Sequence, residues 1–233
     1  SVNDNGTVIH NQNVFIDKTA KIMPQAIIDG ADGPVFIDHS AVIQPNVYIQ
    51  GPVYIGPSTL IKAGANLYSG TSIAEGCKIG GEVNNSIILP WSNKAHGGYL
   101  GSSYVGSWVN FGAGTNNSNL KNNYGSVKVT INGEVIDTGL QFMGLIMGDY
   151  SKCGINTTFN TGTSIGINCN LYGSAIHDKH IPSFTWGSVA DGYTTYKLDK
   201  ALAVNKTVMS RRKQSLSEYD EELLRNVFQL TTG

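Results

Sequence analysis

A polar, glycine-rich stretch at residues 93–125 holds the side chains of this sequence that are best suited to chemistry. His96 is a candidate general base, because histidine gains and loses a proton near neutral pH. Further cationic and hydrogen-bonding side chains surround it, namely Lys94, Tyr99, Asn110, Asn119 and Lys121. Together they would suit an anionic, hydroxylated ligand. Asn and Gly are also ordinary turn residues, so the residue types alone leave a plain structural role equally open.

A six-residue repeat defines the scaffold around this stretch. With one three-residue slip, an aliphatic residue recurs at every sixth position, at Ile16, Ile22, Ile28, Ile37, Ile43, Ile49, Ile55, Ile61, Leu67, Ile73 and Ile79. A small or β-branched residue stands four places after nearly all of them, at Ala20, Ala26, Ala41, Val47, Val53, Thr59, Ala65, Thr71, Cys77 and Val83. This period is typical of short strands and tight turns that stack equivalent side chains along an axis. The sequence therefore predicts an all-β fold, a parallel β-helix.

The phase of the repeat decides which side chains of the polar stretch face outward. It places His96 at an outward corner, and it resumes with Tyr99, Val105 and Phe111 as inward positions. Next comes Gly112-Ala113-Gly114, which would let the backbone approach a bound group closely. A ligand would thus lie on the outside of the coil.

An interruption follows the polar stretch. Residues 126–139 alternate apolar and polar side chains around Asn132-Gly133, which is a strong signal for a two-residue hairpin turn. We expect a β-hairpin inserted into the coil. The repeat then returns with Met147, Cys153, Phe159, Ile165 and Leu171 as inward residues.

The two ends of the chain differ from the repeat. Residues 1–13 are polar, and we expect an irregular lead-in or a cap, with His10 facing solvent. The coil is predicted to span residues 1–194, and residues 195–233 form a helical tail in which Ser215 and Glu218 would make a capping box. Arg211–Lys213 reads as a solvated linker or as a contact for a ligand phosphate. Because the chain lacks an initiator Met, we expect a fragment of a longer protein.

Composition excludes several classes of partner. The net charge is −1 and only 14% of residues are charged, which argues against nucleic acid and anionic membrane surfaces. No apolar run is long enough to span a membrane. The three cysteines fall in inward positions of the repeat and cannot make a closed disulfide framework, which favours packing and a cytoplasmic location.

A metal site is the alternative for the histidines near the end of the coil. His177 and His180 are spaced H-x-x-H, so a zinc enzyme of the β-helix class would need His96 or His39 to join them in space. The long separation in sequence makes this the weaker hypothesis, and no metal site is predicted.

The motifs themselves resemble a known family. The hexads resemble those of the left-handed β-helix acyltransferases, and K-A-H-G-G-Y-L-G at 94–101 with V-G-S-W-V-N-F-G-A-G-T at 105–115 looks like the acetyltransferase domain of bifunctional N-acetylglucosamine-1-phosphate uridyltransferase/glucosamine-1-phosphate acetyltransferases. A subgroup of sugar-nucleotidyltransferase relatives also shares N-L-K-N-N-Y-G, D-T-G-L-Q-F, M-G-D-Y-S-K-C-G-I-N and I-P-S-F-T-W-G. The resemblance implies left-handed coils, a homotrimer, acetyl-CoA as co-substrate and a missing N-terminal nucleotidyltransferase domain.

The resemblance also implies roles for individual residues. His96 matches the base that takes a proton from the amine of a sugar. Substrate-binding positions fall on Tyr99, Asn110 and Asn119, and contacts near the thioester fall on Gly112 and Ala113.

The phosphate end of the implied site departs from the family. Lys62 stands where the family has a phosphate-binding Arg, which keeps the charge but loses the bidentate fork. Ser86 replaces a second phosphate-binding Lys, and Glu82 adds a carboxylate that Lys94 or Lys121 could offset.

Two functions follow as hypotheses. The first is an acetyl-CoA-dependent acyltransferase acting on an amino-sugar phosphate or a nucleotide-sugar. The second is a non-catalytic β-helix that trimerises or regulates a sugar nucleotidyltransferase, motivated by the missing initiator Met and by Ser86.

Overall fold

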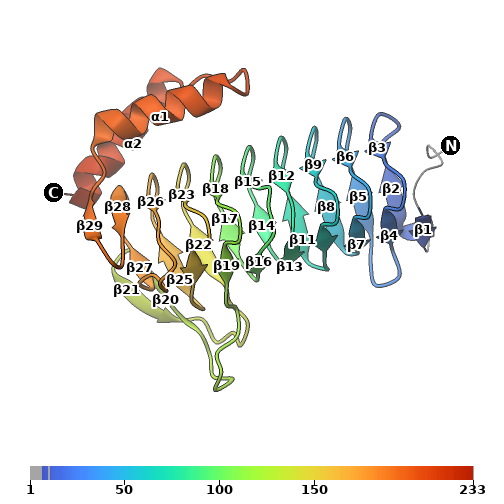
Figure 1. Ribbon diagram of the computed structural model, residues 1–233, viewed down its shortest axis with the longest axis horizontal. Helices are drawn as coiled ribbons and strands as arrows, with labels where there is room; N and C mark the ends of the chain where they lie inside the picture. The colour runs from blue at the N-terminus through green and yellow to red at the C-terminus, as the bar shows by residue number, and fades with distance from the viewer. Residues whose placement is uncertain (1–6, 10, 233) are drawn as a thin grey trace.

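The computed structural model describes residues 7–9 and 11–232, and it shows short parallel strands wound into three faces along one axis (Figure 1). Face A holds β1 (Thr7–Ile9), β4 (Ile27–Asp29), β7 (Tyr48–Gln50), β10 (Asn66–Leu67), β13 (Glu82–Asn84) and β16 (Tyr99–Gly101), continued by β19 (Asn116–Asn117) and β24 (Thr158–Phe159). Face B holds β2 (Val14–Ile16), β5 (Val35–Ile37), β8 (Val53–Ile55), β11 (Thr71–Ile73), β14 (Ile87–Ile88), β17 (Tyr104–Val105), β22 (Leu145–Met147), β25 (Thr163–Ile165) and β27 (His180–Ile181). Face C holds β3 (Lys21–Ile22), β6 (Val42–Ile43), β9 (Leu60–Ile61), β12 (Lys78–Ile79), β15 (Asn93–Lys94), β18 (Asn110–Phe111), β23 (Lys152–Cys153), β26 (Asn170–Leu171), β28 (Thr185–Ser188) and the antiparallel β29 (Gly192–Thr195).

The core is the stack of inward side chains that the repeat predicts. On face A, Ile28 pairs with Ile49, and Ile49 pairs with Leu67, and all three side chains are completely buried. Each such burial contributes about 1.5–3 kcal/mol before the entropy cost of ordering the chain. The parallel β-helix is therefore confirmed, and Cys77, Cys153 and Cys169 are buried free thiols inside it.

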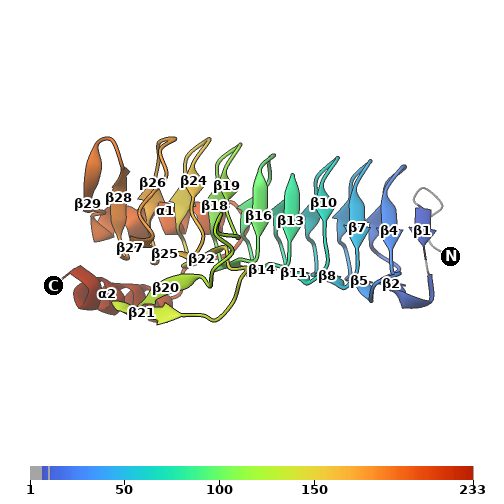
Figure 2. The same ribbon diagram turned by 90° about the horizontal axis from the view of Figure 1, so that it is seen from below.

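The inserted hairpin is also confirmed. Strands β20 (Lys128–Ile131) and β21 (Glu134–Asp137) pair antiparallel around Asn132-Gly133. The hairpin does not project freely, because Val127 and Val129 are buried and the backbone of Lys128 lies against Gly162. Figure 2 shows it beside α2 (Glu218–Thr232).

Two helices follow the coil. Helix α1 (Leu198–Ser210) buries Ala201, Leu202 and Asn205, and the amide of Asn205 donates a hydrogen bond of 2.8 Å to Asn168 of the coil. Helix α2 packs Phe228 edge-on against Phe184, with ring centroids 4.9 Å apart. Both helices thus cover the coil of this chain.

Two local predictions about the ends are wrong. The lead-in is not wholly irregular, since β1 pairs with β4 and η1 (Asn11–Asn13) follows it; His10 lies outside the described residues. The cap of α2 is Ser217, whose Oγ accepts the Asp220 N–H at 3.1 Å and donates to the Asp220 carboxylate at 2.6 Å. The capping pair therefore lies two residues beyond the predicted Ser215 and Glu218.

Candidate functional site

His96 lies on the corner that joins β15 of face C to β16 of face A, and its side chain is exposed, as the repeat phase predicts. The neighbouring corner, which contains Gly112 and Ala113, stacks directly on it, because the N–H of Gly114 donates to the carbonyl of Gly97 at 3.0 Å. A side chain at position 112 would overlap the backbone of Gly154, with a Cβ only 2.2 Å from it. Gly112 therefore allows its corner to stack closely on the following one, which contains Gly154.

Tyr99 leads a polar group on face A beside this corner. The amide of Asn119 donates to the Tyr99 hydroxyl at 3.1 Å and to the Ser102 hydroxyl at 3.1 Å. Glu82 is the strand partner of Tyr99. Burial, and then the Glu82 carboxylate, raise the pKa of the Tyr99 phenol, so this hydroxyl remains a hydrogen-bond donor at neutral pH. The structure thus brings together three of the predicted ligand-binding residues.

Tyr99 corrects the predicted phase of the repeat. The inward position of β16 belongs to Leu100, which is 2% exposed, while Tyr99 lies between buried and exposed. The ring of Tyr99 extends along the outside, since its hydroxyl would meet a Cβ placed on Gly101. A position outside the core agrees with a binding role better than the predicted inward one.

Face A changes its hydrogen bonding next to this polar group. The backbone N–H groups of Tyr99 and Gly101 donate to the side chains of Asn116 and Asn117 at 2.8 and 2.9 Å, in place of strand carbonyls. Strands β16 and β19 therefore belong to separate sheets. The interruption lies where the predicted substrate-binding residues gather.

Asn110 lies on the other side of the corner, on face C. Its strand partner is Asn93, whose side-chain amide donates to the Asn110 Oδ1 at 3.4 Å. The Oδ1 of Asn93 in turn accepts a hydrogen bond of 2.8 Å from the guanidinium of Arg212. The second guanidinium nitrogen of Arg212 donates to the carbonyl of Gly76 at 3.1 Å. The loop after α1 thus contacts face C next to the site. We call His96, Tyr99, Asn119, Asn110 and Ala113 the corner site.

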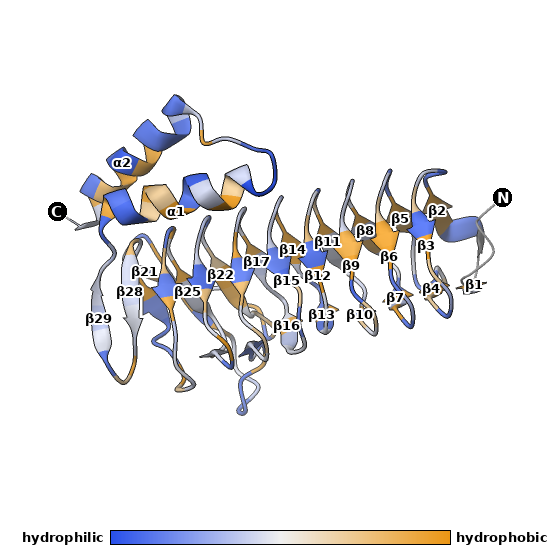
Figure 3. Ribbon diagram, turned by 45° about the horizontal axis from the view of Figure 1, so that its top comes forward, coloured by the Kyte–Doolittle hydropathy of each residue, from blue (hydrophilic) through white to orange (hydrophobic). Residues whose placement is uncertain are grey.

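Cations gather on face C beside the corner site. The charge of Arg212, followed by burial and then by Lys62 and Arg211, lowers the pKa of Lys78, which shows that these four side chains share one electropositive region. Figure 3 shows face C changing from hydrophobic at β6 and β9 to hydrophilic at β12 and β15. Among the described residues, no carboxylate forms an ion pair with any of these four cations.

Lys94 does not face a ligand, and this predicted role is corrected. Its side chain is 4% exposed and points inside the coil, in the strand position that pairs with Ile79. Burial lowers the pKa of its ammonium to about 8, against a smaller opposing effect of Glu82. Ser86 is likewise buried, in the wall of the coil, where its hydroxyl accepts the Ser103 N–H at 3.1 Å. Neither side chain can contact a phosphate on the outer surface.

Lys121 belongs to a different part of the surface. Its ammonium donates to the carbonyl of Ser126. With Asn160 and Lys179 it lines a shallow pocket of about 380 Å³ that does not include His96. The structure therefore places Lys121 apart from the corner site, although Asn119 is only two residues away in sequence.

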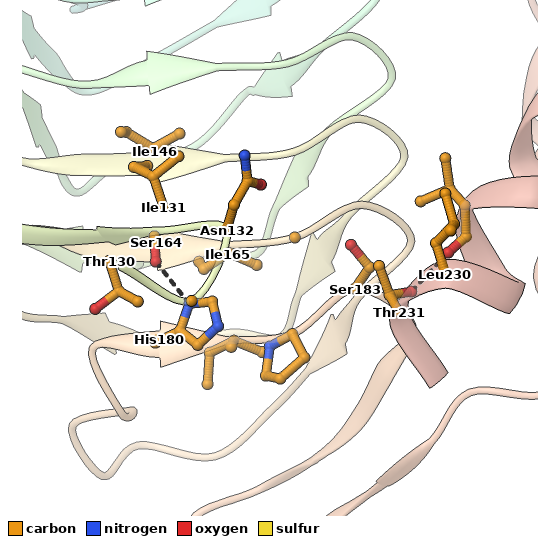
Figure 4. A pocket seen from close by; sticks show the side chains of 15 residues that line it. Thr130, Ile131, Asn132, Ile146, Ser164, Ile165, His180, Ser183, Leu230 and Thr231 are labelled. Carbon is orange, nitrogen blue, oxygen red and sulfur yellow. Dashed lines mark hydrogen bonds between the residues drawn. The ribbon is translucent and has the colours of Figure 1, made fainter. Parts of the chain in front are cut away.

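A larger pocket also lies away from the corner site. It has a volume of about 610 Å³ and is enclosed by the hairpin, face B and the end of α2 (Figure 4). Ile131, Ile146 and Ile165 form much of its wall, and the hydroxyl of Ser164 lies 3.0 Å from Nδ1 of His180. No predicted site residue lines it.

The histidines near the end of the coil have separate environments. His177 is 2% exposed, and its Nδ1 lies 2.9 Å from the hydroxyl of Tyr193, whereas His180 is exposed beside Ser164. Within the described part of the chain, no three His, Cys, Asp or Glu side chains lie close enough to hold a metal. None of the described helices is long and apolar enough to cross a membrane.

Sequence reasoning misses Lys78 of the electropositive region, and it gives Arg212 only as one reading of Arg211–Lys213, a solvated linker or a contact for a ligand phosphate. The repeat phase does put Lys78 outward, one residue before the inward Ile79, so its position could have been found. Arg212 contacts a carbonyl 136 residues earlier in the chain, and no periodic pattern indicates such a contact.

The chain is similar in sequence to several known proteins. No protein-family model matches the chain. Over 182 residues, 68% of the chain, it is 36% identical to a bifunctional sugar-1-phosphate nucleotidylyltransferase/acetyltransferase of Sulfurisphaera tokodaii, of which it spans 45%. It is 34% identical over 58% of its length to a bifunctional protein GlmU of Methanocaldococcus jannaschii, of which it spans 31%. The chain thus spans less than half the length of these relatives.

A shorter relative matches over most of both chains. Over 172 residues, 73% of the chain, the identity with an uncharacterized acetyltransferase, YaiX, of Escherichia coli is 31%, and 75% of that protein is covered. Among solved structures, an Arabidopsis UDP-N-acetylglucosamine acyltransferase aligns with 91% of the chain and 80% of its own, at a TM-score of 0.42 and 14% identity. The chain belongs to the hexapeptide-repeat acyltransferases, whose fold is the left-handed parallel β-helix, and within them to the acetyltransferases related to the bifunctional sugar-1-phosphate nucleotidyltransferases.

Proposed function

We propose that the chain transfers an acetyl group from acetyl-CoA to the amine of an amino-sugar phosphate or a nucleotide-sugar, with His96 as the general base. The observation that carries this proposal is the exposed His96 on a corner that stacks directly against Gly112 and Ala113. A base and a backbone that a thioester can approach closely are thereby adjacent.

The proposed reaction needs few protein groups. The amine nitrogen attacks the thioester carbonyl carbon, and His96 takes the proton that the amine loses. The N–H of Ala113 would donate to the oxyanion that develops on the carbonyl. The carbon–sulfur bond then breaks, and the thiolate receives the proton from His96. The products are an amide and a free thiol.

The polar group on face A suits the sugar. Tyr99 and Asn119 can donate to and accept from ring hydroxyls, and their mutual hydrogen bond of 3.1 Å holds both side chains in place. Glu82 beside them makes this side of the corner less favourable for a phosphate. We therefore assign the sugar ring to face A.

The electropositive region on face C suits phosphate groups. Lys62, Lys78, Arg211 and Arg212 supply charges that no carboxylate among the described residues neutralises. Arg212 can also donate to phosphate oxygens through its planar guanidinium. We assign the phosphates of the acceptor or of acetyl-CoA to this region.

We further infer a homotrimer, which the family resemblance implies. Face B has large exposed apolar side chains in five of six consecutive strands, at Phe15, Phe36, Tyr54, Ile87 and Tyr104, with Ser72 at the equivalent position of the remaining strand. An apolar row of this length favours contact with further copies of the chain. The buried free cysteines agree with a cytoplasmic location, which we also propose.

A substrate panel tests the proposed function. The protein is incubated with acetyl-CoA and one acceptor at a time, including glucosamine-1-phosphate, UDP-linked amino sugars and dTDP-linked amino sugars. Thiol release and mass spectrometry of the acceptor report the reaction. We expect an N-acetylated product from at least one phosphorylated amino sugar. Lack of product, with no binding of any acyl-CoA in calorimetry, would instead support the non-catalytic trimerisation role.

A further inference from the structure

Lys94 is the one charged side chain in the inward row of face C among the described strands. The other inward residues of this row are apolar, at Ile22, Ile43, Ile61, Ile79, Phe111, Cys153 and Leu171. Lysine is almost never buried to this extent unless its charge is compensated. The presence of a lysine at this position therefore calls for a specific role.

Three backbone carbonyls bind the ammonium of Lys94. Its Nζ donates to Gly80 at 2.7 Å, to His96 at 3.1 Å and to Gly98 at 2.7 Å. All three N–H bonds of the ammonium are thus used. Two of the three acceptors belong to the corner that contains His96.

A shortened corner in the preceding turn makes room for this ammonium. Val83 follows Ile79 by four positions, whereas Leu67 follows Ile61 by six and Leu100 follows Lys94 by six. The corner at Gly80-Gly81 is therefore two residues shorter than its neighbours. A Cβ on Gly81 would lie 2.8 Å from the Lys94 Nζ and 2.9 Å from the His96 carbonyl oxygen. The missing residues and the missing side chain leave space for the charge.

Neighbouring turns hold part of the corner bound by Lys94, since the Glu82 N–H donates to the Gly98 carbonyl at 3.1 Å and the Gly114 N–H to the Gly97 carbonyl at 3.0 Å, but its own residues add little rigidity. A Cβ added to Gly97 would have no atom within 4 Å, and Gly98 has a φ of 121°, which L side chains rarely adopt. Two consecutive glycines allow many backbone conformations. We propose that Lys94 is a positioning residue: from inside the coil, its ammonium fixes the carbonyls of His96 and Gly98 and so holds the imidazole of His96 at the corner site.

This inference rests on the proposed function for its catalytic consequence. A general base must lie within hydrogen-bonding distance of the proton that it takes, and a displacement of about 1 Å can cost on the order of a hundredfold in rate. Lys94 does not contact the substrate. Its loss should therefore lower kcat and leave the KM for acetyl-CoA nearly unchanged.

The experiment compares Lys94→Met with Ile43→Met. Both place methionine in the inward row of face C, but Ile43 is far along the coil from His96 and bonds no corner carbonyl. Hydrogen–deuterium exchange of a peptide covering residues 95–101 should rise at least tenfold in Lys94→Met and stay unchanged in Ile43→Met. The kcat should fall at least tenfold only in Lys94→Met. Unchanged exchange in this peptide would overturn the proposal, whatever the activity.

A second pair keeps the test usable if Lys94→Met does not fold. Gly81→Ala places a methyl group against the ammonium, whereas Gly64→Ala adds the same strain at a φ of 71°, close to the 70° of Gly81, with nothing within 4 Å. Faster exchange in residues 95–101 for Gly81→Ala alone supports the proposal, and equal exchange in the two variants contradicts it. Because exchange needs no substrate, a failure of the acyltransferase proposal would be seen separately, as absence of turnover by the wild type.

Discussion

At the scale of single residues, the corner between β15 and β16 has one ionisable side chain on the outside of the coil and another on the inside. His96 is exposed outside, and Lys94 is buried inside, bound to the carbonyl of the same His96. No carboxylate of residues 7–9 and 11–232 forms an ion pair with Lys94, and burial lowers the pKa of its ammonium from the usual 10.5 to about 8. This burial of an ionisable group predicts a measurable pH dependence of stability.

Removing Lys94 should change how stability varies with pH. Between about pH 8 and pH 10 the unfolded chain binds more protons at this residue than the folded chain, so the contribution of Lys94 to stability rises with pH. As pH rises over this range, the free energy of unfolding of the wild type should therefore increase relative to that of Lys94→Met, by up to about 1.4 kcal/mol per pH unit. Urea unfolding at several pH values measures it.

Ile43→Met is the control for this titration, since it removes no ionisable group. Its difference from the wild type should be constant over the same pH range. A constant difference for Lys94→Met as well would show that its ammonium does not have a lowered pKa.

The sequence predicts the orientation of His96 correctly and those of Lys94 and Tyr99 incorrectly, for one physical reason. A strict six-residue phase assumes that every corner has the same length. Six-residue steps back from Val105 reach Tyr99, but Leu100 precedes Val105 by only five residues, so the inward positions fall on Leu100 and Lys94. Glycine and serine fill this shorter turn at residues 101–103 as they fill the full-length turns, so composition does not reveal the missing residue.

At the scale of elements, the coil and the helices differ in how far the sequence determines them. Stacking of equivalent turns requires the same large and small residues in each turn, so the coil can be read from its period. The docking of α1 and α2 depends on non-periodic contacts such as Asn205 with Asn168 and Phe228 with Phe184. An ion pair of 2.5 Å between Lys206 and Glu221 joins the two helices. Their positions therefore could not be predicted.

Adjacent leucines of α2 test this docking. Leu224 is 5% exposed and Leu223 is 49% exposed. We expect Leu224→Ala to lower the free energy of unfolding by about 2–5 kcal/mol, because it leaves a cavity. Leu223→Ala should cost less than about 1 kcal/mol. Denaturant unfolding of both variants measures this, and equal losses would mean that α2 does not pack on the coil through Leu224.

At the scale of the whole molecule, the coil carries different chemistry on its faces. Face C has cations next to the corner site, face A has the Tyr99 and Asn119 group, and face B has a row of exposed apolar side chains. A self-associating surface separate from the reactive corner would leave that corner accessible to ligands.

Phe36→Glu should weaken the proposed trimer. Phe36 is 45% exposed and stacks on Phe15, so a carboxylate there would place charge within the apolar row of face B. Phe142→Glu is the control, because Phe142 is 50% exposed but lies in the insertion after the hairpin. Sedimentation velocity should show three copies for the wild type and for Phe142→Glu, and smaller species for Phe36→Glu. Trimers in all three proteins would exclude face B as the contact.

The rate of acetyl transfer by His96→Asn, compared with His39→Asn, tests the central claim most directly. His39 is also an exposed histidine, paired with Asp38 at 2.8 Å on another corner of the coil. With the acceptor that the panel identifies, His96→Asn should lower kcat by about a hundredfold or more, as expected for loss of a general base. His39→Asn should retain the wild-type rate. A rate for His96→Asn within twofold of the wild type would contradict the assignment of His96 as the base.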